Sequence, residues 1–126
     1  MTAMLEHANL TVPNARETAR WLCEVFGWRI RWQGPAIDDG HTVHVGDDRS
    51  YLAIYQPATA PRPWRESLDS AGGLNHVGIR VDDLDATEAR VKAAGFTPFN
   101  HADYDPGRRF YFRDGDHVEY EVVEYA

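Results

Sequence analysis

The sequence is poor in cysteine, in basic residues and in long apolar runs. Cys23 is its only cysteine, so the chain has no internal disulfide and no zinc site built from cysteines alone. Its 13 Lys and Arg stand against 20 Asp and Glu, which gives a formal net charge of −7. Nucleic acids and anionic membranes attract basic surfaces, so this acidic balance argues against both as partners.

No apolar run reaches the length of a membrane span, and the first ten residues lack the basic start and apolar stretch of a signal peptide. The sequence therefore predicts a cytoplasmic protein. Its 126 residues, 43% apolar and 26% charged, are typical of one globular domain, or of two small repeats that share a core.

An internal repeat organises the chain. Residues 5–12, LEHANLTV, resemble residues 74–81, LNHVGIRV, with a histidine at the same position in each. Each copy continues into a helical pattern that ends at a glycine, Gly27 or Gly95, followed by an aromatic residue. Copies of about 60 residues bury little core alone, so we expect a single domain over residues 1–126.

Each copy has the pattern of a βαβββ unit. In the first, residues 4–12 alternate as a strand, and Asn14 is a typical helix N-cap with Glu17 three positions on. The strands expected after this helix are 28–32, 41–46 and 50–56. The second copy predicts a strand at 74–81, a helix from about 83–85 to 95, strands at about 96–100, 108–113 and 117–124, and an irregular loop at 101–109. A proline-containing linker, at about 58–72, separates the modules, at about 1–57 and 73–126.

Two histidines and a glutamate are the strongest candidates for chemistry. His7 and His76 occupy equivalent positions, so a pseudo-twofold arrangement of the copies would bring both imidazoles to one groove; the alternative is a pair of hydrogen-bonded strand histidines. The acid must come from the last strand, where Glu119 and Glu121 share a face. Two imidazoles and a carboxylate are a set that borderline divalent metals prefer.

The repeated unit with its first-strand histidine, together with the ending FRDGDHVEYE at 112–121, resembles the vicinal oxygen chelate superfamily of glyoxalases, extradiol dioxygenases, fosfomycin-resistance transferases and bleomycin-binding proteins. The resemblance implies an α+β fold of two tandem βαβββ modules whose curved mixed sheets form a cleft. The family's ligand glutamate lies seven residues after the first Asp of the terminal turn, and from Asp114 this count reaches Glu121. Gly115 and His117 replace the family's usual Pro and Gly, which leaves the shape of the turn open. The metal ligands that the resemblance implies are His7, His76 and Glu121.

Members with four protein ligands take another from the last strand of the first module. Laying residues 50–56 over the final strand puts Leu52 or Ile54 opposite Glu121, and neither binds metal; Gln56 is the nearest substitute. Three ligands with open positions resemble the extradiol dioxygenase arrangement, so Fe(II) is the favoured metal, with Mn, Ni or Zn as alternatives.

A second resemblance concerns proton transfer. Part of the chain resembles a pattern of extradiol enzymes, in which a His is followed by a Tyr and then by a ligand Glu ten residues after the Tyr. Here His101, Tyr111 and Glu121 follow that order, with ten residues from Tyr to Glu. His101 or Tyr111 is expected to act as general acid or base. The alternatives are a loop histidine without a role and an ordinary sheet aromatic. The residues expected to line the substrate pocket are Gln56, Trp28, Trp32 and Tyr55, although strand alternation explains the tryptophans as core packing as well.

Two functions from different classes fit these features. The first is a metal-dependent enzyme whose small substrate chelates the metal through adjacent oxygens, with a dioxygenase-like reaction favoured over a lyase or isomerase. The second is a metal-free binding protein like the bleomycin-sequestering members, for which a charge of −7 and four tryptophans are suitable. The joint presence of the three ligands favours the enzyme. The resemblance also implies a homodimer.

Overall fold

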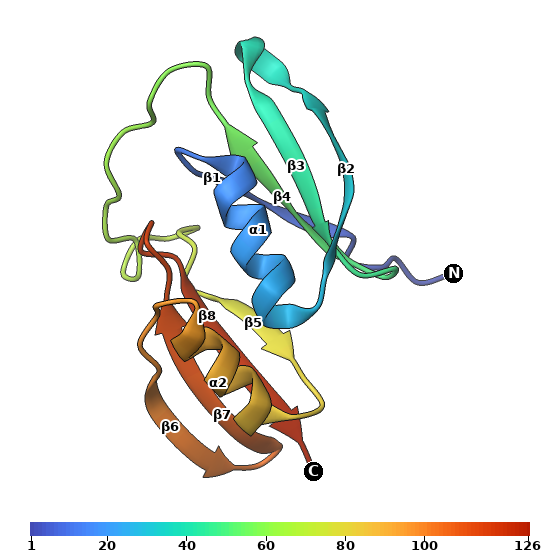
Figure 1. Ribbon diagram of the computed structural model, residues 1–126, viewed down its shortest axis with the longest axis vertical. Helices are drawn as coiled ribbons and strands as arrows, with labels where there is room; N and C mark the ends of the chain where they lie inside the picture. The colour runs from blue at the N-terminus through green and yellow to red at the C-terminus, as the bar shows by residue number, and fades with distance from the viewer. The chain divides into compact units, whose positions relative to one another are not determined.

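The computed structural model describes residues 1–126 and contains the repeated βαβββ unit that the sequence predicts (Figure 1). The chain divides into two compact units, Met1–Arg62 and Pro63–Ala126. Each unit has one four-stranded mixed sheet and one helix, so the α+β class is confirmed. Neither helix is long and apolar enough to cross a membrane.

The first unit contains β1 (His7–Thr11), α1 (Ala15–Phe26), β2 (Arg29–Pro35), a 3₁₀ turn (Ile37–Asp39), β3 (His41–Gly46) and β4 (Tyr51–Gln56). Its strand order is β1-β4-β3-β2, and only β1 and β4 are parallel. α1 packs on β3 and β4, where Leu52 and Ile54 are buried. Because strand residues alternate, Tyr51 and Tyr55 face away from α1.

Helix α1 begins and ends where the sequence predicts. The Asn14 side chain accepts a hydrogen bond of 3.1 Å from the backbone N–H of Glu17, which caps the first turn. Gly27 follows the helix at φ 70°, a left-handed conformation that glycine adopts without steric cost, and its N–H donates to the carbonyl of Cys23. Residues adjacent to the helix therefore set both of its ends.

The second unit repeats this order with β5 (Val77–Arg80), α2 (Leu84–Ala93), β6 (Phe99–Tyr104), β7 (Gly107–Arg113) and β8 (Glu119–Tyr125). Its strand order, β5-β8-β7-β6, matches that of the first unit. The predicted irregular loop at 101–109 is wrong, because β6 continues to Tyr104 and pairs with β7 from Gly107 onward. A bulge between Phe99 and Ala102, with Asn100 at φ 53°, disrupts the period-two pattern from which a strand is recognised.

Alternation along β7 and β8 separates core from surface in the second unit. Phe110, Phe112 and Tyr120 are fully buried, and the rings of Phe112 and Tyr120 stack with centroids 5.1 Å apart. The residues that alternate with them, Tyr111 and Glu121 among them, therefore face the opposite side of the sheet. The packing of this core places the residues of the candidate site.

The turn between β7 and β8 is held by a buried carboxyl group. The Oδ1 atom of Asp114 accepts hydrogen bonds from the backbone N–H groups of Asp116 and Val118, at 2.8 and 3.0 Å. Burial raises the pKa of Asp114 to about 6, although these N–H groups act in the opposite direction.

Asp114 should make the stability of the fold depend on pH. Its pKa in the folded state lies above the ordinary value of 3.8, so its protonated form stabilises the fold below that pH, and this contribution is lost as the pH rises toward 6. Asp114→Asn keeps the acceptor oxygen and mimics the neutral carboxyl group. Between pH 4 and 6, we expect the unfolding free energy of the wild type to fall by about 2 kcal/mol more than that of the variant. Urea unfolding at several pH values measures this, and parallel curves for the two proteins would contradict it.

Candidate functional site

His76 and Glu121 lie side by side in the second unit. His76 directly precedes β5, and Glu121 lies on β8, the strand that pairs in parallel with β5. The Nε2 atom of His76 is 3.0 Å from Oε1 of Glu121, and the two side chains are 33% and 13% exposed. The structure thus brings together two of the three predicted ligands.

Both first-strand histidines are oriented by the side chain of the preceding residue. Nδ1 of His76 is 2.7 Å from Oδ1 of Asn75, and Nδ1 of His7 is 2.9 Å from Oε1 of Glu6. The hydrogen bond from His7 lowers the pKa of Glu6, which therefore stays ionised and only accepts. Each Nδ1 therefore faces an oxygen acceptor, which favours the ring proton on Nδ1 and leaves Nε2 for another contact. Metal-binding histidines commonly have one ring nitrogen hydrogen-bonded in this way. A polar residue precedes each histidine in the sequence, and this repeated feature could have identified Glu6 and Asn75 as their partners.

Arg109, on β7, binds the second carboxylate oxygen of Glu121. Its Nη1 donates to Oε2 at 2.6 Å, and the side chains are 10% and 13% exposed. One oxygen of Glu121 therefore faces Arg109 and the other faces His76. The ion pair was not predicted from the sequence, because the face that Arg109 shares with Glu121 depends on the register of β7 and β8.

Tyr111 completes this group of side chains. It lies opposite Glu121 in the register of β7 and β8, and its ring meets that of His76 edge-on, with centroids 5.9 Å apart. Burial raises the pKa of the Tyr111 phenol, and the negative charge of Glu121 raises it further. Tyr111 therefore keeps its proton at neutral pH and is suited to donate a hydrogen bond or a proton.

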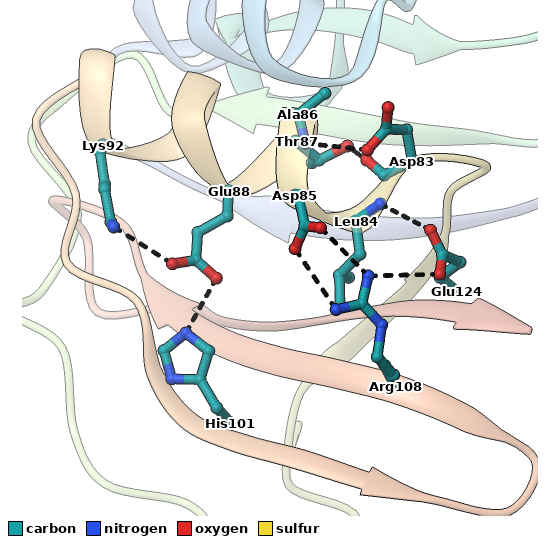
Figure 2. A network of polar contacts seen from close by, with 10 residues as sticks. All are labelled: Asp83, Leu84, Asp85, Ala86, Thr87, Glu88, Lys92, His101, Arg108 and Glu124. Atoms are coloured by element: carbon teal, nitrogen blue, oxygen red, sulfur yellow. Dashed lines mark hydrogen bonds and ion pairs between the residues drawn. The ribbon is translucent and has the colours of Figure 1, made fainter.

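His101 lies on the other face of the same sheet, toward α2. Its Nε2 is 2.8 Å from Oε1 of Glu88, whose other oxygen binds Lys92 at 3.2 Å (Figure 2). The His101 ring also stacks on the buried ring of Phe110. The structure does not bring His101 to Tyr111, because the bulge in β6 directs it toward the helix.

A hollow of about 330 Å³ lies beside His101, lined by residues of α2, β6 and β7. Arg108, one of its lining residues, binds the carboxylates of Asp85 and Glu124 at 3.4 Å, as Figure 2 shows. Glu124 in turn accepts the backbone N–H of Leu84 at the start of α2. These contacts hold the helix on its sheet and account for Arg108 and the two carboxylates that it binds.

His7 lies in the first unit, at the start of β1. Its ring stacks on Tyr51 with centroids 4.9 Å apart, Tyr51 stacks on His44 at 4.5 Å, and His44 lies 5.1 Å from Trp32. These four residues, here termed the ring row, come from four neighbouring strands. Burial lowers the pKa of His44, which favours its neutral form. Within either unit, no three His, Cys, Asp or Glu side chains form a group able to hold a metal.

The aromatic residues predicted to line a pocket have different surroundings. Trp32 belongs to the ring row and is 51% exposed. Trp28 instead packs against Phe26 at the end of α1, with centroids 5.1 Å apart. Tyr55 donates its hydroxyl to a carbonyl of the 3₁₀ turn at 2.9 Å. Of the three, Trp32 has the surroundings that best suit contact with a ligand.

Gln56 does not take the place of a metal ligand in the first unit. Its Oε1 accepts the backbone N–H of Ala15 at 2.9 Å, which binds the end of β4 to the start of α1. Glu124 makes the equivalent contact with Leu84 in the second unit. Gln56 therefore corresponds to Glu124, which binds α2, and not to Glu121.

The position that corresponds to Glu121 in the first unit is Ala53. In each unit the first and last strands pair in parallel, and the residue two positions after the histidine lies opposite Ala53 or Glu121. The predicted counterparts, Leu52 or Ile54, are each wrong by one residue, because sequence overlay does not determine the register of a strand pair. Ala53 has no metal-binding group either, so the first unit offers no fourth ligand at this position.

Solved structures share the fold of this chain. A glyoxylase/bleomycin resistance protein/dioxygenase domain from Frankia sp. EAN1pec is 20% identical, with a TM-score of 0.84 and 100% of each chain covered. A mutant of the fosfomycin resistance protein FosX from Listeria monocytogenes, complexed with Mn(II) and 1S,2S-dihydroxypropylphosphonic acid, is 18% identical, with a TM-score of 0.73 over 100% of this chain and 95% of that one. TnmS3, an antibiotic binding protein from Streptomyces sp. CB03234, is 16% identical, with a TM-score of 0.75 over 99% and 98%.

These likenesses show the fold alone, and a search of curated proteins found no match. The same architecture is thus found in an antibiotic binding protein and in a protein complexed with Mn(II). A family model for the Glyoxalase/Bleomycin resistance protein/Dioxygenase superfamily matches residues 4–122, a range that includes both histidines and Glu121. The chain therefore belongs to the glyoxalase/bleomycin resistance protein/dioxygenase superfamily, as the repeat and the terminal motif indicated.

Proposed function

We propose that this chain is a metal-dependent enzyme and that His7, His76 and Glu121 bind its divalent metal ion. The observation that carries the proposal is the contact between His76 and Glu121. Nδ1 of His76 faces Oδ1 of Asn75, and its Nε2 lies 3.0 Å from a carboxylate oxygen of Glu121. A contact of this length needs a positive charge between the two atoms, either a proton on Nε2 or a metal cation.

A divalent metal fits this pair of donors. Two ligands at right angles, each about 2.1 Å from a metal, are about 3.0 Å apart, and the observed separation is 3.0 Å. Imidazole nitrogen with carboxylate oxygen suits Fe(II), Mn(II), Ni(II) and Zn(II), and Fe(II) is favoured because three protein ligands leave positions for a substrate and dioxygen. His7, the ligand from the first unit, has its Nδ1 held by the preceding side chain in the same way as His76.

The proposed substrate is a small molecule with two adjacent oxygens. A bound metal supplies Lewis acidity that polarises those oxygens. Tyr111 keeps its proton beside Glu121 and donates it, or a hydrogen bond, to a substrate oxygen. Trp32, half exposed in the ring row, offers a flat surface to a planar substrate. We propose a dioxygenase-like reaction ahead of a lyase or isomerase reaction.

Metal content and ring cleavage test this function. We expect protein purified without chelator and loaded with Fe(II) to hold about one ion per chain, and His76→Ala to lose it. The matched control is His41→Ala, which removes a strand histidine that binds Gln33 instead. Anaerobic loading with Fe(II), followed by a panel of catechols and air, should give a coloured product. A loaded protein that gives none would favour lyase or isomerase chemistry.

A metal-free binding protein is the second candidate. The observation in its favour is the ion pair of Arg109 and Glu121, which already neutralises the carboxylate without a metal. The ring row would then stack a flat ligand. Protein that stays metal-free when offered Fe(II), Mn(II), Ni(II) and Zn(II), but whose tryptophan fluorescence is quenched by planar cations, would favour this candidate.

The proposal includes a homodimer, which the resemblance to the superfamily implies. Light scattering during size-exclusion chromatography measures the mass in solution. A mass of one chain at micromolar concentration would contradict this part of the proposal without affecting the metal site.

A further inference from the structure

We propose that Arg109 is a positioning residue that leaves Glu121 a single free oxygen and thereby sets which cations the site accepts. This inference rests on the proposed metal site, and it adds a determinant of metal selectivity outside the ligands themselves. It follows from three features of Arg109: its contacts, its burial and its charge.

Three contacts hold the guanidinium of Arg109 in place. Its Nη1 donates to Oε2 of Glu121 at 2.6 Å, its Nη2 donates to the carbonyl of Gly107 at 3.2 Å, and the ring of Tyr104 lies 4.3 Å from its central carbon. Gly107 is itself packed tightly, because a Cβ there would lie 2.0 Å from the carbonyl oxygen of Glu124. The Gly107 carbonyl and the Tyr104 ring thus hold the guanidinium in place, and Oε2 of Glu121 is occupied by its hydrogen bond with Arg109.

Burial distinguishes this ion pair from a surface pair on the same two strands. Both side chains of the Arg109 pair are about nine-tenths buried, whereas Arg113 and Glu119, also on β7 and β8, are 55% and 21% exposed at 2.9 Å. The Nε atom of Arg109 is also buried without a hydrogen-bond partner. A buried donor without an acceptor destabilises the fold, so packing alone does not account for an arginine here.

The consequence concerns the kind of cation that Glu121 can bind. Ca²⁺ is bound largely by oxygen ligands, often by both oxygens of one carboxylate, and its attraction to the site is electrostatic. Transition metals accept imidazole nitrogen and one carboxylate oxygen. Arg109 removes the second oxygen of Glu121 and places a positive charge beside it. It therefore disfavours Ca²⁺ more than Zn²⁺.

Calorimetric titration of the full chain with Zn(II) alone and with Ca(II) alone tests this inference. The measured quantity is the ratio of the two dissociation constants, calcium over zinc. We expect Arg109→Met, which removes charge and donors at similar length, to lower this ratio about tenfold. Arg109→Lys keeps the charge and should stay within about threefold of wild type. Arg113→Met, the matched control in the exposed pair, should leave the ratio unchanged.

The possible outcomes separate this inference from the proposed function. Zinc binding by the wild type with an unchanged ratio in Arg109→Met overturns the inference alone. A wild type that binds no metal overturns the proposed function and, with it, the inference. If Arg109→Met does not fold, Tyr104→Ala loosens the same guanidinium from an exposed position, and the ratio should fall by about threefold. An unchanged ratio in that variant also overturns the inference.

Discussion

Glu121→Gln is expected to weaken divalent metal binding by on the order of a thousandfold, because it replaces a charged ligand oxygen with a neutral amide. The amide oxygen still accepts a hydrogen bond from Arg109, so the fold should persist. Competition with a coloured chelator measures the affinity. Thermal unfolding with and without metal measures it independently, since a ligand that binds only the folded state raises its stability.

Glu119→Gln is the matched control for this prediction. Glu119 lies two residues earlier on β8, on the same face, and binds Arg113 at 2.9 Å. Its substitution removes the same charge from the same strand, and we expect metal affinity to stay within about twofold because a surface ion pair contributes little. Equal losses in the two variants would mean that the net charge of the sheet face, and not Glu121 as a ligand, governs binding.

Phe112→Ala is expected to have the largest effect on stability. The Phe112 ring is fully buried and packs against Tyr120, Phe96 and Phe110, with centroids 5.1, 5.7 and 6.4 Å apart. Removing it leaves a cavity in the core of the second unit, which should cost about 3–5 kcal/mol in unfolding free energy. Urea denaturation measures this cost, which is large beside the total stability of roughly 5–15 kcal/mol for a typical domain.

Phe99→Ala is the control for the core prediction. Phe99 lies at the start of the edge strand β6, half-buried beside Tyr111 and Arg113. Deleting the same ring there should cost only about 1 kcal/mol, because water can reach the space it leaves. If the two variants lose equal stability, the aromatic group around Phe112 is not the core of its unit.

The Phe112→Ala prediction also concerns the candidate site, because the core and the site share strands β7 and β8. Phe112 and Tyr120 face the core, while their neighbours Tyr111 and Glu121 face the candidate site. A cavity beneath the sheet should shift Tyr111 and Glu121 together. Phe112→Ala is therefore also expected to weaken metal binding, although it touches no ligand.

Much of the candidate site followed from local sequence. The repeat located His7 and His76, the terminal motif located Glu121, and the structure places His76 against Glu121. The residues that orient the histidines, Glu6 and Asn75, are their direct neighbours in the chain. Such contacts are recoverable from sequence because they need no knowledge of strand pairing.

The contacts of other residues could not be predicted from local sequence patterns. His101 was expected near Tyr111, but a bulge in β6 directs it to Glu88 on α2. Gln56, expected to line the substrate pocket and the nearest substitute for a fourth ligand, binds the start of α1. The partner of Glu121, Arg109, depends on the register of β7 and β8. A single extra residue reverses the face of every side chain beyond it, and local alternation does not reveal such a residue.

The sequence by itself determined the duplicated βαβββ order, the ends of α1 and the alternation that puts Glu121 and Tyr111 on the face opposite the core. Only the tertiary structure decided that Ala53 is the counterpart of Glu121 and that Arg109 holds one of its oxygens. The physical reason is the range of the interactions. Caps and strand alternation depend on residues a few positions apart, whereas strand register and buried ion pairs are set by contacts between segments far apart in the chain.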